Sequence, residues 1–127
     1  MLKWVLIAVG GAFGSILRYW VQGWVQRLAG STFPMGTLAV NVTACFAIGL
    51  LAGFFAGPQL VREEYRIGLT VGVLGGYSTF STFGLETFNL ANDSEYSLAL
   101  LNMFVSCAAG FAAVWFGYRI AERWIGA

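Results

Sequence analysis

Four long apolar stretches, separated by short polar segments, dominate the pattern along the chain. They cover roughly residues 4–24, 35–57, 67–91 and 96–118. Each is long enough to cross the hydrocarbon core of a lipid bilayer, which is about 30 Å thick and takes about 20 helical residues. The pattern therefore predicts an all-α membrane protein, with four transmembrane helices that form a single domain over residues 1–127.

The third stretch contains a polar interruption where the middle of a membrane helix is expected. Residues 72–88 read GVLGGYSTFSTFGLETF. Two adjacent glycines, Gly75 and Gly76, lower helix propensity by about 1 kcal/mol each, and the serines and threonines that follow offer the backbone competing hydrogen bonds. Freed backbone groups at membrane depth need partners in protein or in a water-filled cavity. We therefore expect the third helix to be broken near its middle, at an ion or substrate site.

Composition agrees with a membrane location. The chain is 58% hydrophobic and 10% charged, with a mean hydropathy of +0.73. Soluble domains contain about 25% charged residues. The even number of spans places both termini and the loop before residue 67 on one side, and the positive-inside rule favours the cytoplasm for that side. Arg18 and Arg27 oppose this bias.

The residue types present argue against several functional classes. The chain has no histidine, which removes the commonest metal ligand and the commonest general base. Cys45 and Cys107 each lie inside a span and are interpreted as small buried hydrophobes. No paired carboxylates, nucleophile and base, or basic nucleic-acid patch can be assembled from this sequence. We therefore expect neither an enzyme nor a partner of nucleic acid.

Helical spacing within the third span separates an aromatic stripe from a hydroxyl-rich one. Phe80 and Phe83 are three residues apart, so their rings are expected to lie one above the other. The positive edges of aromatic rings favour a small anion when neutral hydrogen-bond donors complete its shell. The alternative is that both rings simply contact lipid. Asn41, inside the second span, is either such a donor or a hydrogen-bonding contact between helices, and the sequence favours neither.

Other polar and small residues in the spans also have two interpretations. Arg18 either extends to the membrane interface or attracts anions to a mouth, and the first is the more common behaviour. Asn102, Ser106 and Gly110 form one stripe that either packs or lines a passage. The paired glycines at four-residue spacing, in the first two spans, are interpreted as helix-packing positions (Gly10, Gly14, Gly49 and Gly53).

The break itself suggests a cation site. Carbonyl oxygens from an unwound segment over Gly75–Ser78 can coordinate a small hard cation such as Na⁺. One chain offers too few oxygens for a closed shell, whereas two chains meeting at a two-fold axis would supply four. Four helices also cannot easily enclose an aqueous pathway alone, so a transport function would require an oligomer.

Three motifs together make the chain resemble the Fluc (CrcB) family of fluoride channels over nearly its whole length. They are Gly11 to Gly14 leading to Arg18, Gly36 to Leu38 leading to Asn41, and Gly75 to Phe83 followed by Glu86. The resemblance implies an antiparallel, dual-topology homodimer with two pores. Such a dimer would export fluoride passively across the bacterial inner (plasma) membrane and so lower toxic cytoplasmic fluoride.

The resemblance also implies roles for individual residues. The pore would be lined, and fluoride bound, by Asn41, Phe80, Phe83 and Ser106. A polar track facing the phenylalanines would contain Thr37, Ser81, Thr82 and Glu86, and Arg18 would lie near an aqueous vestibule. The carbonyls of Gly75 and Ser78 from both subunits would hold a central, structural Na⁺ that is not transported.

A small multidrug-resistance-type exporter is the alternative of similar size and span number. That chemistry needs a carboxylate within the first span, where it exchanges protons for cationic drugs. The first span of this chain contains no acidic residue, and Glu86 is the only one at depth in any span. The sequence therefore favours the channel.

Overall fold

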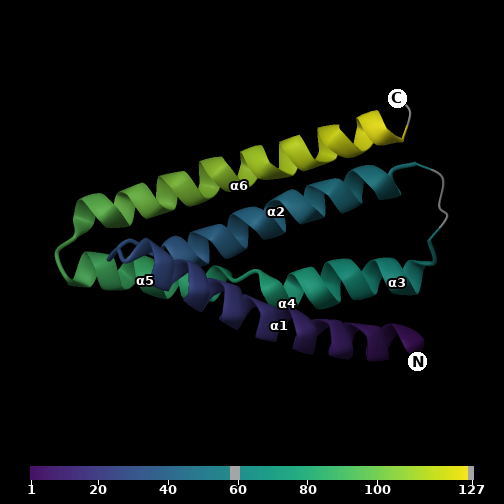
Figure 1. The fold of residues 1–127 in the computed structure, drawn as a ribbon, viewed down its shortest axis with the longest axis horizontal. Coiled ribbons are helices and arrows are strands. Elements are labelled where there is room, and N and C mark those ends of the chain that lie inside the picture. The colour runs from purple at the N-terminus through teal and green to yellow at the C-terminus, as the bar shows by residue number, and fades with distance from the viewer. Residues whose placement is uncertain (58–60, 126–127) are drawn as a thin grey trace.

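The computed structural model describes residues 1–57 and 61–125; residues 58–60 and 126–127 of the predicted domain lie outside the described part. All regular structure in that part is helical. The elements are α1 (Leu2–Ala29), α2 (Met35–Phe55), α3 (Glu63–Ile67), the π-helix η1 (Gly68–Leu74), α4 (Gly75–Tyr77), α5 (Phe80–Asn92) and α6 (Tyr96–Trp124). These elements form antiparallel spans, the third of which is built from α3, η1, α4 and α5 (Figure 1). The predicted four-helix architecture is confirmed.

The first and last helices run beyond the apolar stretches that predicted them. α1 ends at Ala29 rather than near residue 24, and α6 continues to Trp124 rather than residue 118. Hydropathy marks the part of a helix that fits the hydrocarbon, while glutamine and arginine are good helix formers that continue the helix into water. α1, α2 and α6 are each long and apolar enough to cross a membrane.

The side chain of Gln26 stabilises the turn between the first two helices by hydrogen bonds. α1 ends where Gly30 adopts a left-handed conformation (φ 57°) that suits glycine, and the Gly30 N–H donates to the Gln26 carbonyl at 3.1 Å. The Gln26 side-chain amide donates to the carbonyls of Ser31 (2.8 Å) and Phe33 (3.1 Å). Its oxygen accepts the N–H of Gly36 at 2.9 Å, which satisfies a donor at the start of α2. The turn therefore fixes where α2 begins.

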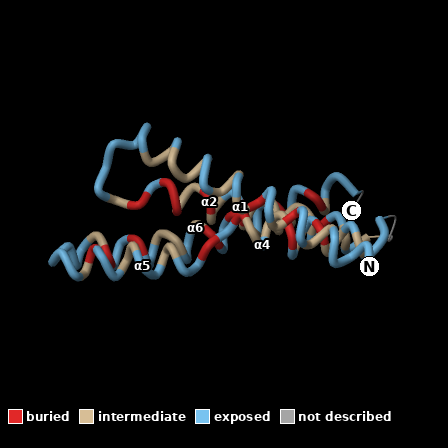
Figure 2. The backbone as a smooth tube through the Cα atoms, turned by 90° about the horizontal axis from the view of Figure 1, so that it is seen from below, coloured by how far each residue is buried: buried red, intermediate tan, exposed pale blue. Residues whose placement is uncertain are grey.

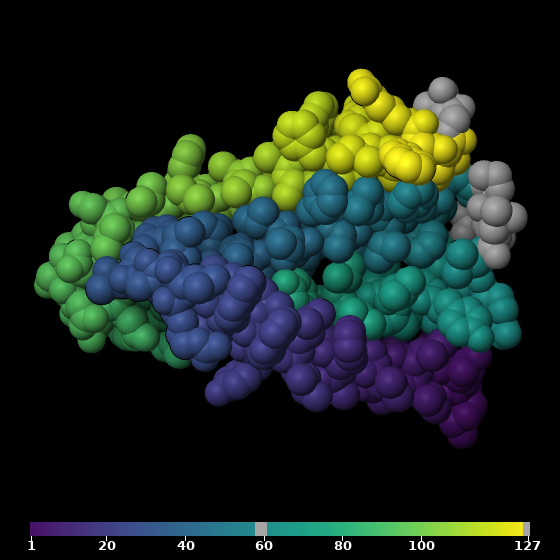
Figure 3. All heavy atoms as spheres, viewed as in Figure 1, coloured from purple at the N-terminus to yellow at the C-terminus, as the bar shows by residue number. Residues whose placement is uncertain are grey.

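Two pairs of glycines allow neighbouring spans to pack closely. A Cβ on Gly49 or Gly53 of α2 would collide with α6, and one on Gly10 or Gly14 of α1 would collide with the backbone of η1. Both pairs of glycines are therefore confirmed as packing positions. Small residues allow this close approach in lipid, where dispersion contacts rather than the hydrophobic effect hold helices together. As Figure 3 shows, α1 and α6 form the two edges of the molecule, with α2 and the third span between them.

The buried core is small and lies where α1, α2 and α4 meet. Val40, Ala44 and Tyr77 are buried, and Leu17 and Val21 pack against them. The Tyr77 hydroxyl reaches Thr43 Oγ1 at 2.9 Å, so the phenol has a partner at membrane depth. Elsewhere the outer faces of the helices are exposed (Figure 2). These faces carry large apolar side chains, including Trp4, Phe13, Trp20, Phe104 and Phe111.

Both chain ends lie at the same end of the molecule. Figure 1 places the start of α1, the end of α6 and the beginning of α3 there, and the turns after α1 and α5 at the opposite end. This confirms the arrangement expected for an even number of spans. The break in the third span, between α4 and α5, lies between these two ends of the molecule (Figure 1).

Candidate functional site

The third span breaks at Ser78 and Thr79, whose backbones are extended (ψ 157° and 114°). Asn41 of α2 holds this break by pairing with the Thr79 backbone. Thr79 N–H donates to Asn41 Oδ1 at 2.8 Å, and Asn41 Nδ2 donates to the Thr79 carbonyl at 2.9 Å. The side-chain amide thus replaces the backbone partners that the interrupted helix cannot supply.

The helix resumes immediately because Thr79 caps α5. Its Oγ1 accepts the Thr82 N–H at 3.2 Å and donates to Thr82 Oγ1 at 3.0 Å. An N-cap threonine satisfies one of the free donors at a helix start. The serines and threonines that follow the glycine pair therefore include the residue that caps the second half-helix, α5.

The break lies later than the glycine pair predicted. Gly75 and Gly76 are helical, within α4, and the prediction that unwinding begins at Gly75 is corrected to Ser78. The physical reason is packing: a Cβ on Gly76 would lie 2.6 Å from the Gly11 carbonyl oxygen of α1. This glycine is required for close approach of two helices, not for flexibility.

The carbonyls of Gly75 and Ser78 are nevertheless among those that lose their helical donors at the break. In a continuous helix Gly75 O would accept from Thr79 N–H and Ser78 O from Thr82 N–H. These donors go instead to Asn41 Oδ1 and Thr79 Oγ1. Gly75 and Ser78 are both exposed and line one hollow of about 170 Å³ against α2 and η1. The two residues predicted to offer carbonyls to a cation are therefore freed by the same two hydrogen bonds.

Arg18 lies beside this break. Its Nε donates to the Gly76 carbonyl at 3.1 Å, and the residue is half-buried between α1 and α4. A charged donor thus satisfies a carbonyl near the end of α4, where the helix dipole favours positive charge. The sequence predicted Arg18 either near an aqueous vestibule or at the membrane interface. In the structure its guanidinium group points toward the third span, where it contacts Gly76.

A groove of about 250 Å³ gathers all four predicted pore-lining residues. Asn41, Phe80, Phe83 and Ser106 line it, together with Ser78, Thr79, Cys45 and Cys107. They come from α2, the break, α5 and α6, which are distant in sequence. The rings of Phe80 and Phe83 have centroids 5.5 Å apart and planes tilted by 45°, so the two rings are neighbours on one side of the helix, as their spacing predicted, but they are not stacked.

A chain of hydrogen bonds runs from this groove into the α5–α6 contact. Ser106 Oγ donates to Asn102 Oδ1 at 3.3 Å, and Asn102 Nδ2 donates to Thr87 Oγ1 at 2.8 Å. The Thr87 hydroxyl in turn donates to the Phe83 carbonyl at 2.7 Å. Sequence reasoning assigned no role to Thr87; its position four residues after Phe83, opposite a polar stripe, was the available signal.

The four residues expected to form a polar track lie in different surroundings within one chain. Thr37 is buried on α2, one turn before Asn41, and its hydroxyl has no partner among the described residues. Ser81 is exposed, and its hydroxyl lies 3.4 Å from the hydroxyl of the capping residue Thr79. Thr82 belongs to the same cap. The chain therefore brings Ser81 and Thr82 together and leaves Thr37 on a separate helix.

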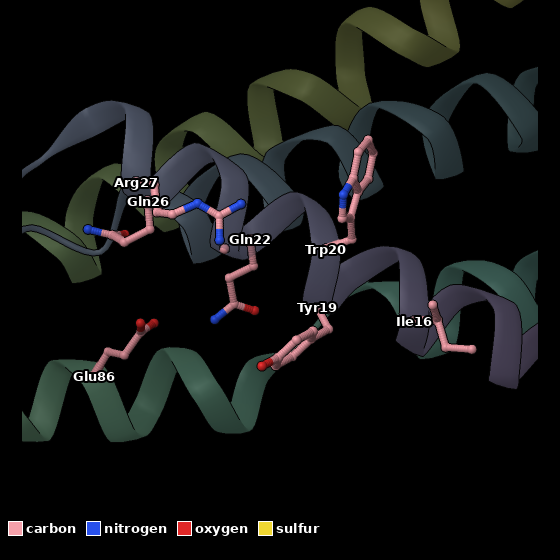
Figure 4. Close-up of a pocket in the computed structure, with 8 residues that line it drawn as sticks. Ile16, Tyr19, Trp20, Gln22, Gln26, Arg27 and Glu86 are labelled. Carbon is pink, nitrogen blue, oxygen red and sulfur yellow. The ribbon is translucent and has the colours of Figure 1, made fainter.

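Glu86 faces α1 rather than the phenylalanine groove. It lines a hollow of about 510 Å³ with residues of the second half of α1, among them Tyr19, Gln22 and Arg27. Figure 4 shows its carboxylate directed across this space toward the glutamines of α1. Glu86 Oε1 is buried and has no partner within the described chain. The hollow is a second space, next to α5 but separate from the groove, and its lining mixes Glu86, Arg27 and two glutamines with apolar and aromatic side chains.

Comparison with known proteins decides the family. The family model described as "CrcB-like protein, Camphor Resistance (CrcB)" matches residues 5–118. The chain belongs to the CrcB family. A curated relative from Geobacter metallireducens, named "Fluoride-specific ion channel FluC", is 46% identical over 97% of this chain and 99% of its own length. Proteins of the same name from Geobacter sulfurreducens (47% identical, 92% and 94% covered) and Solibacter usitatus (41%, 96% and 100%) also match.

Membership of the CrcB family, together with the apolar helices, identifies a multi-pass bacterial membrane protein. The CrcB relatives are named as channels, which are not enzymes. The match covers all four spans, so it includes every residue of the groove and of the break. The recognition made from the three sequence motifs is confirmed.

Proposed function

We propose that the chain is a fluoride-selective ion channel through which fluoride leaves the bacterial cytoplasm passively, lowering its toxic concentration there. The observation that carries this function is the groove that Phe80 and Phe83 line together with Asn41 and Ser106. The names of the CrcB relatives support fluoride as the ion.

The chemistry of the groove suits a small, strongly hydrated anion that must also be released. Asn41 has two Nδ2 hydrogens, and one of them goes to the Thr79 carbonyl, which leaves a second donor for the anion. The positive edges of Phe80 and Phe83 add a weak attraction. The residues that line the groove within the described chain include no lysine or arginine. A fixed cation would bind the anion too strongly for rapid conduction.

We further propose that the working unit is an antiparallel, dual-topology homodimer with two pores. The groove of a single chain is open on one side, and the Phe80 side chain is 83% exposed. A second copy would cover this aromatic face and complete the lining. It would also bring a second set of polar-track residues to each passage, since Thr37 and Glu86 lie away from the phenylalanines of their own chain.

A structural Na⁺ between the two copies is part of this proposal. The donor set fits, because the Gly75 and Ser78 carbonyls have lost their helical donors and both residues are exposed. Carbonyl oxygens of unwound helices are suitable ligands for Na⁺, and two copies would offer four of them. When bound, the ion would supply positive charge that neutralises converging carbonyl dipoles at the dimer axis.

Efflux from liposomes tests the function. Purified protein is reconstituted into vesicles loaded with fluoride or chloride, and the release of each anion is followed with an ion-selective electrode while a potassium ionophore removes the membrane potential. We expect rapid fluoride release and little chloride release. Equal release of the two anions, or release of neither, would contradict the channel. Proton-coupled uptake of a quaternary ammonium dye would instead support the exporter considered above.

A further inference from the structure

Asn102 is a buried amide in the middle of the α5–α6 contact. Its side chain is only 2% exposed, and it is one of the two largest fully buried side chains in the described chain. Burying an amide without hydrogen-bond partners is unfavourable, so the Asn102 side chain needs the hydrogen bonds that it makes here. Nδ2 donates to Thr87 Oγ1 and Oδ1 accepts from Ser106 Oγ. Asn102 thus links the groove residue of α6 to α5.

Thr87 transmits this link to the aromatic residues. Its hydroxyl donates to the Phe83 carbonyl, one turn earlier in α5, at 2.7 Å. The hydroxyl hydrogen is committed there, so the oxygen is left to accept from Asn102 Nδ2, as observed at 2.8 Å. The chain of donors therefore has one consistent direction, from Ser106 through Asn102 and Thr87 to the peptide group of Phe83.

α5 is not continuous with α4, so its orientation depends strongly on its contact with α6. The extended residues Ser78 and Thr79 separate α5 from α4, so no helical hydrogen bonds transmit the orientation of α4 to it. α5 packs chiefly against α6 and only slightly against α2. Asn102 to Thr87 is the one side-chain hydrogen bond between α5 and α6 within the described residues. Rotation of α5 about its axis would move Phe80 and Phe83 relative to Ser106.

We propose that Asn102 is a positioning residue for fluoride permeation. It acts through Thr87 to hold the half-helix that carries Phe80 and Phe83 in a fixed orientation against Ser106. This inference rests on the proposed channel function. It assigns Asn102 a role away from the anion, because the residue is buried and does not line the groove.

The test compares Asn102→Leu and Thr87→Val, which remove the link at either end with little change of volume. Thr87→Ser retains the hydroxyl, and Asn92→Leu alters an exposed asparagine of α5 as a matched control. Vesicles are prepared at a protein-to-lipid ratio that gives, on average, less than one channel per vesicle. The fraction that empties then reports how many channels are active, and the release rate reports flux per active channel. Size-exclusion chromatography checks that each variant assembles.

We expect the rate per channel to fall about tenfold in both Asn102→Leu and Thr87→Val, with the double variant no slower than either, because both break the same link. Thr87→Ser and Asn92→Leu should stay within about twofold of the unchanged chain. A purely structural role would lower only the emptied fraction, and that result would overturn the inference, as would an unchanged rate. Thr87→Val alone carries the test if Asn102→Leu does not assemble.

The two proposals fail in different ways. If the unchanged chain releases no fluoride, the proposed function is overturned and the inference falls with it. If the unchanged chain conducts and all variants conduct equally fast per channel, the inference alone is overturned.

Discussion

At the scale of single residues, one side chain combines two roles that the sequence left as alternatives. Asn41 was either a contact between helices or a donor for an anion. In the structure it bonds the Thr79 backbone at both ends of its amide and also lines the groove. The same bonds that hold the break in place also orient the remaining N–H. The structural contact and the proposed binding role are therefore compatible.

The phenylalanines provide the first prediction at this scale. Phe80→Ile and Phe83→Ile each keep an apolar side chain but remove the positive ring edge. We expect each to slow fluoride release from vesicles by about tenfold or more, equivalent to a barrier about 1.4 kcal/mol higher, while the dimer stays assembled. Phe88→Ile is the matched control, because Phe88 is exposed on the same half-helix and does not line the groove. Unchanged release in both test variants would mean that the rings only pack.

At the scale of elements, the third span is shaped by its neighbours. Gly10 and Gly14 of α1 admit the backbone of η1, and Gly76 of α4 admits the backbone of α1. η1 is a π-helix, which is wider than an α-helix. This form is rare in proteins overall, but where it occurs it often lies at a functional site. The extended break follows only after this packed region, where Asn41 and Thr79 provide replacement hydrogen bonds. Close packing against α1 therefore holds the first half of the span, η1 and α4, in place. The second half, α5, begins where Thr79 caps it.

A pair of glycine substitutions tests this division. Gly76→Ala would place a methyl group 2.6 Å from the Gly11 carbonyl oxygen, so we expect a loss of stability of about 1–3 kcal/mol. Gly84→Ala meets no atom within 4 Å and should leave stability unchanged or raise it by up to about 1 kcal/mol, through helix propensity. Thermal unfolding in detergent measures both. Equal melting temperatures for the two variants would show that Gly76 serves flexibility instead.

At the scale of the whole molecule, a single chain leaves the proposed pore open on one side. Its buried core is small, its outer faces are apolar, and the aromatic groove is open along one side. Both termini lie at one end, so a second copy in the opposite orientation would place its termini on the other membrane surface (Figure 1). The freed carbonyls of Gly75 and Ser78 are exposed and can therefore meet those of such a copy.

The proposed central ion leads to a prediction about Na⁺. Replacing all Na⁺ by a large organic cation should abolish most fluoride release, because four unpartnered carbonyls would converge without a counter-charge. Radioactive ²²Na⁺ uptake into the same vesicles should remain at the level of protein-free vesicles. Full fluoride release without Na⁺ would contradict a structural ion, and ²²Na⁺ uptake that accompanies fluoride would contradict an ion that is not transported.

The sequence by itself determined four spans, their antiparallel order, the break in the third and the position of Phe80 and Phe83 on one side of the helix. These follow from hydropathy and helical spacing, which act over a few turns of one helix. Only the tertiary structure decided that the break lies at Ser78 and Thr79, that Gly76 serves packing, and that Glu86 faces α1. Each of these involves a part of another helix: the Asn41 amide, the Gly11 carbonyl and the second half of α1, which lines the same hollow as Glu86. Partners distant in sequence leave no periodic signal, because their spacing along the chain is set by how the helices cross.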